Sequence, residues 1–262
     1  MAIVAAAILP HSPLLLPGLA KAVKSKVNKT NSAITILGQE LYARQINRVI
    51  LIASHNPSHE LVNQFCLLQA ASLPYRFNEF GDLKTSGTMR LDVAFTHRLK
   101  EAAETQFSLP LLSLKTLPYT FAVPWAVLHN YLNEAAAVCL QIPRTASFED
   151  LRWLAGLLKD MASQDGSRVA VIAAGNLAHF NTKQDTAAKI FDQSFRQAVQ
   201  DADVDKLLNL ETKLRQQSQE CLVNPAIFLY TLLEQYHFTT DILSYENELG
   251  VGLMVANLII NS

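Results

Sequence analysis

The chain has 262 residues, half of them hydrophobic, with 22 Lys and Arg against 23 Asp and Glu and a formal net charge of −1. This length suits one large α/β domain, and the apolar fraction allows a sizeable core. Because no basic surplus exists to neutralise phosphates, nucleic acid is not an expected partner. The small net charge limits self-repulsion, so a homo-oligomer is permitted without being indicated.

Three cysteines, Cys66, Cys139 and Cys221, lie far apart in the sequence. Their odd number and wide spacing predict neither a disulfide framework nor a Cys-x-x-Cys zinc site. We therefore expect a reducing, cytoplasmic setting.

The apolar opening from Ala2 to Leu9 has no basic segment before it, and prolines interrupt its continuation. Both features disfavour a signal peptide. No uninterrupted apolar run approaches the ~20 residues of a membrane-spanning helix, so a membrane is not an expected partner.

Apolar runs and helical periodicity alternate along the first half of the chain. Consecutive apolar residues predict strands buried on both faces, and apolar residues at every third or fourth position predict helices. The expected elements are a strand at Ile3–Leu9, a helix from about Leu19 to Gln45 broken near Asn28–Asn31, strands at Arg48–Ser54 and Phe65–Ser72, a Gly-containing loop at Phe80–Thr88, a helix at Arg90–Thr105, a strand at Leu109–Leu114, a helix at Pro124–Glu134 with the proline near its start, and a strand at Ala136–Ile142.

Helices dominate the second half. The expected elements are a helix beginning at Ser147, a strand at Arg168–Ala174, amphipathic helices at Gln184–Asp201 and Asp203–Gln219, a more apolar helix at Asn224–Tyr236, and closing strands at Thr239–Tyr245 and Val251–Ile260. Strands that alternate with helices predict a single α/β domain with helices on both faces of the sheet.

Three of the predicted strands are followed by a histidine: His11, His55 and His179. In open α/β sheets, sites form at the carboxyl ends of strands, where loops converge. Two imidazoles and one carboxylate leave coordination positions open, an arrangement that suits non-heme Fe(II). The sequence thus predicts a mononuclear metal site with His11 as its first ligand; the alternative is that each is a loop histidine bonded to a backbone carbonyl.

Two further patterns are less informative. His59 follows His55 by four positions, but Pro57 lies between them, so one shared helix face cannot be assumed. Gly250 and Gly252 in ELGVGL precede a terminal strand instead of opening a helix, and so do not form a dinucleotide-binding fingerprint.

Four segments of the chain carry a family resemblance. ILPHSPLLLPGL, VILIASHNP, AAGNLAH and ILSYENELGVGLMVA occur in this order and span almost the whole chain. They resemble the opening, the second strand, the Ser-Gly-Asp-Leu-Ser-His segment and the ending of the class III extradiol ring-cleavage dioxygenases, the LigB-type catalytic subunit, and of the related Memo-like proteins. The resemblance implies one domain over residues 1–262, a three-layer α/β/α sandwich around a mixed, largely parallel central sheet.

The same resemblance implies roles for individual residues. His11 and His55 would be imidazole ligands of Fe(II), and Glu220 would be the carboxylate ligand. His179 would be the acid–base residue beside the metal. Glu246, in the similar tail, is a rival for the place of Glu220, and zinc or another divalent metal at these ligands is the alternative to iron.

The implied reaction is extradiol cleavage of a small aromatic diol by O2. A catechol-type ring would chelate the iron through two oxygens while O2 takes the remaining position. A histidine with a pKa near neutrality can take a hydroxyl proton and later return one.

Departures from the family pattern lie around the expected ligands. Pro118–Thr120 stands where the family commonly has Asp-His-Gly, so Tyr119 replaces a histidine; a tyrosine can donate a hydrogen bond but cannot act as a base near pH 7. Asn176 and Ala178 replace polar Asp and Ser beside His179. These changes leave a second interpretation, a non-catalytic Memo-like metal- or partner-binding protein that keeps the dioxygenase pocket.

Overall fold

A central mixed sheet organises the structure, which is a computed structural model. It describes residues 3–19, 21–54, 64–106, 108–132, 134–164, 166–182 and 185–261. Within these ranges, eight strands follow the order β6-β3-β7-β2-β8-β1-β10-β9. The four central strands run parallel: β1 (Ile3–Leu9), β2 (Arg48–Ala53), β7 (Ala136–Gln141) and β8 (Val169–Ala174). The flanking strands are β3 (Cys66–Leu68), β6 (Leu111–Leu112), β9 (Phe238–Glu246) and β10 (Leu253–Ile260). The pairs β3–β7, β1–β10 and β10–β9 are antiparallel, whereas β6 pairs with β3 in parallel.

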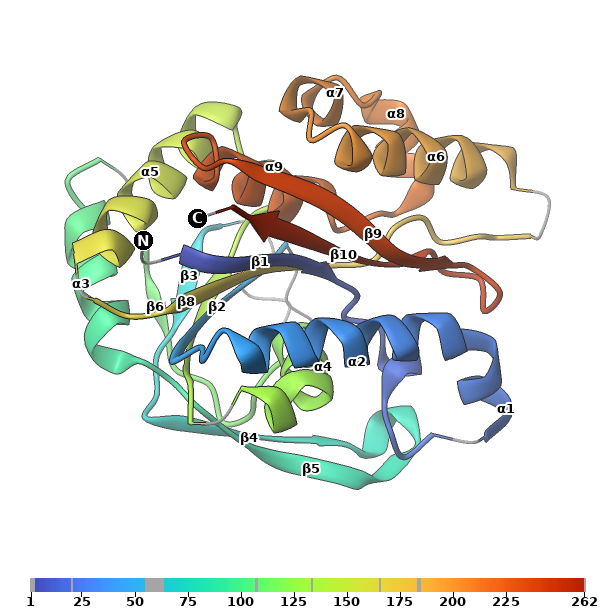
Figure 1. The fold of residues 1–262 in the computed structure, drawn as a ribbon, viewed down its shortest axis with the longest axis horizontal. Helices are drawn as coiled ribbons and strands as arrows, with labels where there is room; N and C mark the ends of the chain where they lie inside the picture. The colour runs from blue at the N-terminus through green and yellow to red at the C-terminus, as the bar shows by residue number, and fades with distance from the viewer. Residues whose placement is uncertain are drawn as a thin grey trace.

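Helices cover both faces of this sheet, which gives the three expected layers (Figure 1). One face carries α3 (Val93–Ala103), α5 (Phe148–Gln164), α6 (Thr186–Gln200), α7 (Val204–Leu208), α8 (Thr212–Ser218) and α9 (Val223–Leu232). The other carries α1 (Lys21–Lys24), α2 (Asn28–Ala43), α4 (Tyr119–Leu128) and a hairpin of β4 (Ser72–Phe77) and β5 (Asp82–Arg90). Short 3-10 helices are η1 (Pro13–Leu15), η2 (Ser25–Val27), η4 (Asn78–Phe80) and η5 (His129–Tyr131).

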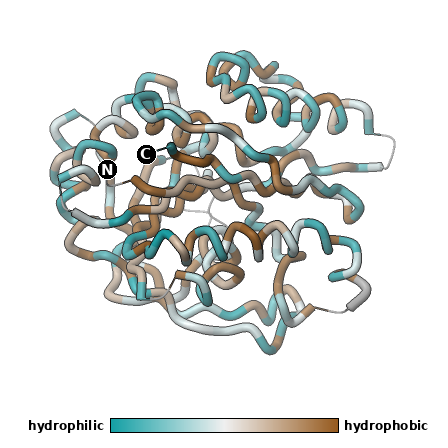
Figure 2. Tube along the Cα trace, in the orientation of Figure 1, coloured by the Kyte–Doolittle hydropathy of each residue, from teal (hydrophilic) through white to brown (hydrophobic). Residues whose placement is uncertain are grey.

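The central strands divide the hydrophobic core into two halves. Along β1, Ala6 and Ile8 pack towards α5 and α9, whereas Ala7 and Leu9 pack towards α2 and α4. Successive side chains of a strand point to opposite faces, so a strand covered on both sides is apolar at every position. Hydrophobic residues are accordingly concentrated along the strands in the middle of the molecule (Figure 2).

The predicted strands at 3–9, 48–54, 136–142 and 168–174 are confirmed, and so is the mixed α/β sandwich. The loop predicted at Phe80–Thr88 is wrong, because β5 occupies most of it and pairs with β4. The polar, Gly-containing sequence of β5 lacks the apolar pattern by which a strand is predicted. The glycine at position 87 makes room for the Tyr75 ring, because a Cβ there would lie 2.5 Å from the Tyr75 hydroxyl oxygen.

Several predicted helix boundaries also need correction. The helix expected to begin at Pro124 begins at Tyr119, and the proline lies inside it. The first long helix breaks at η2, just before Asn28, and not within 28–31. The helix expected at Asp203–Gln219 is divided into α7 and α8. Propensity alone does not locate such breaks, because tertiary packing decides them.

A buried aspartate fastens the β4–β5 hairpin to the N-terminal segment. Asp82 is fully buried, and its two carboxylate oxygens accept backbone N–H groups from Gly18, Lys84 and Thr85 at 2.8–2.9 Å. Burial alone would raise the pKa of Asp82, but the bonds from Thr85, Lys84 and Gly18 outweigh it and lower the pKa.

We expect Asp82→Asn to lower the free energy of unfolding at pH 7 and to make that free energy less dependent on pH. A carboxyl with a depressed folded-state pKa stabilises above its unfolded value, ~3.9, and the contribution disappears as the pH falls through the folded value. Urea denaturation from pH 7 to pH 2 measures this. The difference in unfolding free energy between wild type and Asp82→Asn should shrink towards low pH. Asp241→Asn, at an exposed position, is the control, and its unfolding free energy should vary with pH as that of wild type does.

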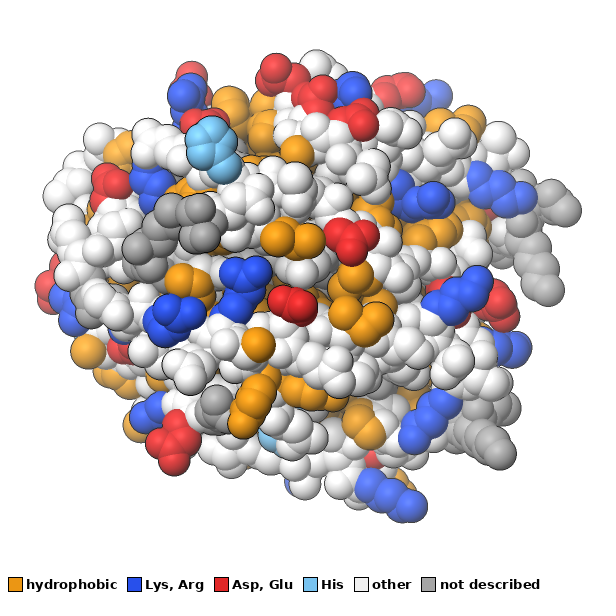
Figure 3. All heavy atoms as spheres, viewed as in Figure 1, with side chains coloured by type: hydrophobic (Ala, Val, Ile, Leu, Met, Phe, Trp, Pro, Cys, Tyr) orange, Lys and Arg blue, Asp and Glu red, His pale blue; other side chains and the backbone are white. Residues whose placement is uncertain are grey.

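The surface in Figure 3 shows Lys and Arg interspersed with Asp and Glu and with small apolar areas. All three cysteines are free and buried. In the described ranges, none of the helices combines the length and apolar character needed to cross a bilayer.

Candidate functional site

The carboxyl ends of the central strands lie in one row at one edge of the sheet. Leu9 pairs with Ala174, Ala174 with Ala53, and Ala53 with Gln141, so the last residues of β1, β8, β2 and β7 are in register. The segments that follow these strands therefore gather at the same edge. This is the edge at which open α/β sheets build their sites.

His11, two residues after β1, is fully buried at this edge. Its Nε2 lies 3.3 Å from the sulfur of Cys221. Its ring meets that of Tyr119 edge to face, with centroids 5.7 Å apart. Ser12 begins η1 directly afterwards, which turns the chain away and leaves His11 at the end of the strand.

Cys221 is the residue that the sequence analysis did not assign to the site. Its thiol accepts the N–H of Asn176 at 3.2 Å, and its carbonyl accepts the Ser54 hydroxyl at 2.7 Å. Gly175 permits this approach, because a Cβ there would lie 2.8 Å from the Cys221 carbonyl oxygen. Burial raises the pKa of the Cys221 thiol to about 12, so in the protein alone the sulfur is a neutral thiol.

Glu220 lies beside this cluster, but its carboxylate already has partners. It is 2% exposed, and Oε1 accepts the Arg215 Nε–H at 2.9 Å. Oε2 accepts the N–H groups of Leu222 and Val223, both at 2.9 Å, at the start of α9. Glu220 thus stabilises the amino-terminal end of α9, where unpaired amides and the helix dipole favour a carboxylate.

Glu246, the alternative carboxylate ligand, contacts α2 on the other face of the sheet. It accepts the N–H groups of Lys29 and Thr30 and the Thr30 hydroxyl, at 3.3, 2.8 and 2.7 Å. These donors belong to the first turn of α2. Glu246 therefore caps the amino-terminal end of α2.

His179 follows β8 and keeps contact with solvent. Its N–H donates to the Ser218 carbonyl at 2.8 Å, which ties it to the segment that leads to Glu220. Burial of part of the imidazole, followed by the positive charge of Arg144, lowers the pKa of His179. Near pH 7 the imidazole is therefore neutral and able to accept a proton.

Tyr119 begins α4 and contacts both His11 and Phe80 through ring edges. Burial raises the pKa of Tyr119 to about 12, with a smaller contribution from Cys221. The phenol consequently stays protonated at neutral pH. It can donate a hydrogen bond into the site but cannot serve as a base there.

The expected ligand set is only partly within the described residues, because His55 lies outside them. His59, to which no role was assigned, also lies outside them. Within the described ranges, no three His, Cys, Asp or Glu side chains are grouped so that they could hold one metal ion. The donor chemistry nevertheless fits a metal at one point, where an imidazole and a sulfur from opposite ends of the chain meet.

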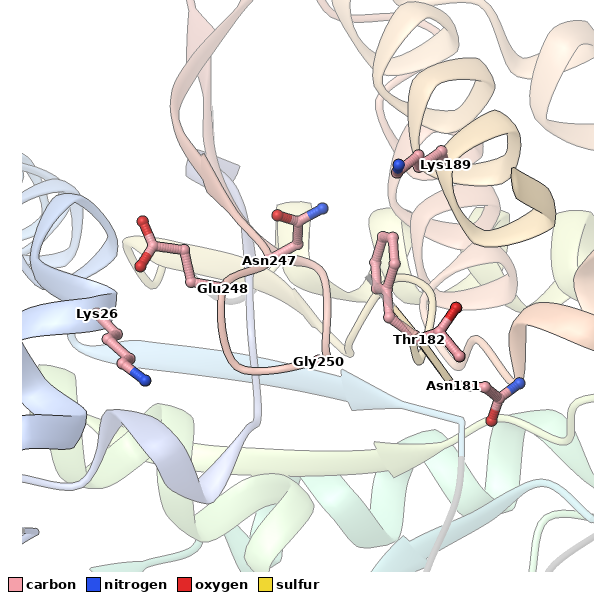
Figure 4. Close-up of a pocket in the computed structure, with 8 residues that line it drawn as sticks. Lys26, Asn181, Thr182, Lys189, Asn247, Glu248 and Gly250 are labelled. Atoms are coloured by element: carbon pink, nitrogen blue, oxygen red, sulfur yellow. The ribbon is translucent and has the colours of Figure 1, made fainter. Parts of the chain in front are cut away.

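A cavity of about 640 Å³ adjoins the His179 segment (Figure 4). It lies between the turn that joins β9 to β10, the start of α6 and η2. Its walls carry two lysines, three side chains with an amide or a hydroxyl, a phenyl ring, a carboxylate and a glycine, namely Lys26, Lys189, Asn181, Asn247, Thr182, Phe180, Glu248 and Gly250.

Comparison with known proteins supports the resemblance seen in the sequence. Residues 5–256 match the family model described as the catalytic LigB subunit of aromatic ring-opening dioxygenase. Protein CA_C1420 of Clostridium acetobutylicum is 20% identical over 267 residues; the match covers 96% of this chain and 56% of that protein, so this chain spans about half its length. An uncharacterised protein of Escherichia coli K12, JW3007, has the same fold, with a TM-score of 0.60, 13% identity and coverage of 98% and 99%. Because the family model matches nearly the whole length, the chain belongs to the family of the catalytic LigB subunit of aromatic ring-opening dioxygenases.

Proposed function

We propose that this chain is an Fe(II)-dependent extradiol dioxygenase that opens the ring of a small aromatic diol with O2. The observation that carries the proposal is the buried imidazole of His11 at the carboxyl edge of the sheet, in contact with the segment that contains Glu220 and Cys221. Family membership supplies the reaction class. His11, His55 and Glu220 would hold the iron, which when bound supplies the route for electrons from the diol to O2.

The neighbouring side chains suit such a reaction. His179, with its lowered pKa, is neutral and can take a proton from a diol hydroxyl. Tyr119 remains a donor and can bond an oxygen of the bound diol. Glu220 offers about four acceptor positions as a carboxylate, of which three are used, so one remains for ligation.

The test is anaerobic loading with Fe(II), followed by metal analysis and oxygen uptake with a panel of catechols. Wild type should bind about one iron and consume O2 with at least one diol. His11→Ala should weaken iron binding by at least ~100-fold, because loss of a ligand exceeds the 10–100-fold typical of an outer-shell change. His237→Ala, which removes an exposed imidazole, is the control and should match wild type. Iron binding that survives His11→Ala would contradict the proposal.

A second candidate is a metal- or partner-binding protein without ring-cleavage activity. Two observations favour it: the Glu220 carboxylate is engaged by Arg215 and α9, and the sulfur of Cys221 is the donor atom in contact with His11. A sulfur donor favours zinc or Cu(I), and zinc has no redox chemistry with O2. Native metal content separates the two: zinc with no oxygen uptake supports this candidate, and diol cleavage that requires His179 excludes it.

A further inference from the structure

The segment that carries His179 is held between two other parts of the chain. The N–H of Leu177 donates to the Gly252 carbonyl, and the N–H of Gly252 donates to the Ala178 carbonyl, at 2.9 and 2.8 Å. Phe180 is bonded in the same way to Gly250. Residues 177–180 thus form a short antiparallel ladder with residues 250–252, directly before β10.

One amide of this segment points to a different partner. The N–H of Ala178, the residue directly before His179, donates to Oδ1 of Asp192 at 2.8 Å. Asp192 lies in α6 and is 1% exposed. Its Oδ2 accepts the Tyr245 hydroxyl at 2.6 Å, and that hydroxyl accepts the Asn247 side-chain amide at 3.1 Å.

The packing around this carboxylate is close. A Cβ on Gly252 would lie 2.4 Å from Oδ2 of Asp192 and 2.8 Å from Cβ of Leu177. Only a glycine lets the last strand approach both groups, which explains one of the two glycines of ELGVGL. The guanidinium of Arg196 lies over the Tyr245 ring, 4.4 Å from its centroid.

Burying a carboxylate costs hydration free energy, which only hydrogen bonds to the buried group can offset. An apolar side chain of similar volume would fill the same space without the loss of hydration. Of the two hydrogen bonds that Asp192 accepts, one comes from the backbone amide of Ala178, directly before His179. The other comes from the Tyr245 hydroxyl, which orients the carboxylate. We propose that Asp192, oriented by Tyr245, is a positioning residue for His179, because it fixes the backbone from which the imidazole extends.

The charges around the network are compatible with this role. Burial raises the pKa of Asp192 to about 6, while bonds from Tyr245 and Ala178 and the charge of Arg196 oppose the rise. Near pH 7 Asp192 is therefore mostly ionised, and both of its oxygens accept. Asn247 lines the cavity of Figure 4, as do Phe180 and Gly250, so the network extends from that wall to the His179 backbone.

The test compares Asp192→Leu with Asp192→Asn in the full chain. Leucine fills the volume but accepts no hydrogen bond, whereas asparagine keeps one oxygen for the Ala178 amide. We expect Asp192→Leu to speed hydrogen exchange of that amide by more than about tenfold and Asp192→Asn to preserve most of the protection. The NMR titration of His179, assigned with His179→Gln, should move up towards the ordinary ~6.5 in Asp192→Leu as the segment loosens.

Two further variants keep the test decisive. Tyr245→Phe removes the hydroxyl that orients the carboxylate and should give an intermediate rate of exchange at Ala178, even if the leucine variant does not fold. Asp203→Asn removes a carboxylate from the cap of α7 and should leave both readouts unchanged. The proposal would be overturned if the Ala178 amide exchanged and His179 titrated in Asp192→Leu as they do in wild type. If only Tyr245→Phe folds, the same result in that variant would overturn it.

The catalytic consequence rests on the proposed function, but the two NMR readouts do not. If the iron-loaded protein cleaves a diol, Asp192→Leu should lower kcat more than it changes KM and should shift the acidic limb of the pH profile upwards. Absence of turnover in wild type would reject the proposed function alone. An unchanged Ala178 amide and His179 titration would reject the positioning role alone.

Discussion

Replacing Glu220 by alanine is expected to lower the free energy of unfolding by about 3–5 kcal/mol, the typical cost of breaking a buried ion pair from one side. The side chain is 2% exposed and accepts three hydrogen bonds. Alanine leaves Arg215 without its carboxylate and leaves the amides of Leu222 and Val223 without acceptors at the start of α9. Equilibrium denaturation in urea measures the loss.

Glu246→Ala is the matched control, since Glu246 also accepts the first amides of a helix but keeps some contact with solvent. Its loss should cost about 1 kcal/mol, as is usual for a helix cap. Equal losses in the two variants would show that Glu220 has no more than a capping role. A Glu220 variant that is as stable as wild type would contradict the contacts described here.

Gly175→Ala is expected to destabilise the protein by about 1–3 kcal/mol and, if His11 holds iron as proposed, to weaken iron binding. The new Cβ would lie 2.8 Å from the Cys221 carbonyl oxygen and 2.9 Å from Cα of Leu222. Both are backbone atoms, so no side chain can rotate away, and the chain after β8 must separate from Cys221. Denaturation and iron titration of the same variant measure the two effects.

Gly156→Ala provides the comparison. Gly156 lies inside α5, and an added Cβ would meet no atom within 4 Å. Alanine removes the conformational penalty of glycine in a helix, so this change should stabilise by up to about 1 kcal/mol. If the two variants behave alike, the close approach at Gly175 does not constrain the site.

Much of the fold follows from the sequence because buried parallel strands have an unmistakable pattern. Apolar residues at every position of Ile3–Leu9 and Val169–Ala174, and at every position of β2 after Arg48, identify the centre of the sheet. The β4–β5 hairpin was missed, because only alternate residues of β4 are buried and most of β5 is polar. Its position depends on Asp82, a contact with Gly18 across 64 residues that no local pattern reveals.

The site shows a similar division. The place of His11 at the carboxyl edge of the sheet could be predicted, because the residue follows a strand that is apolar at every position and therefore central in the sheet. Cys221 could not, because its contact with His11 joins residues 210 positions apart. The one available signal was its position next to Glu220. The bonds of Glu220 and Glu246 to helix amides could not be predicted either, because each carboxylate accepts amides of a helix that only the folded structure places beside it.

The order of strands in the sheet has a consequence for synthesis. Of the eight strands of this sheet, β1 is synthesised before the others, but it lies between β8 and β10, so both of its partners come from the later part of the chain. The first of them begins at Val169, about 160 residues after β1 ends. At ~5–20 residues per second, the wholly apolar strand waits roughly 10–30 s on the ribosome before a neighbour exists. Until then its apolar side chains and unpaired backbone groups have no sheet to join, so the interval before β8 is made is the one in which the chain is most exposed to aggregation.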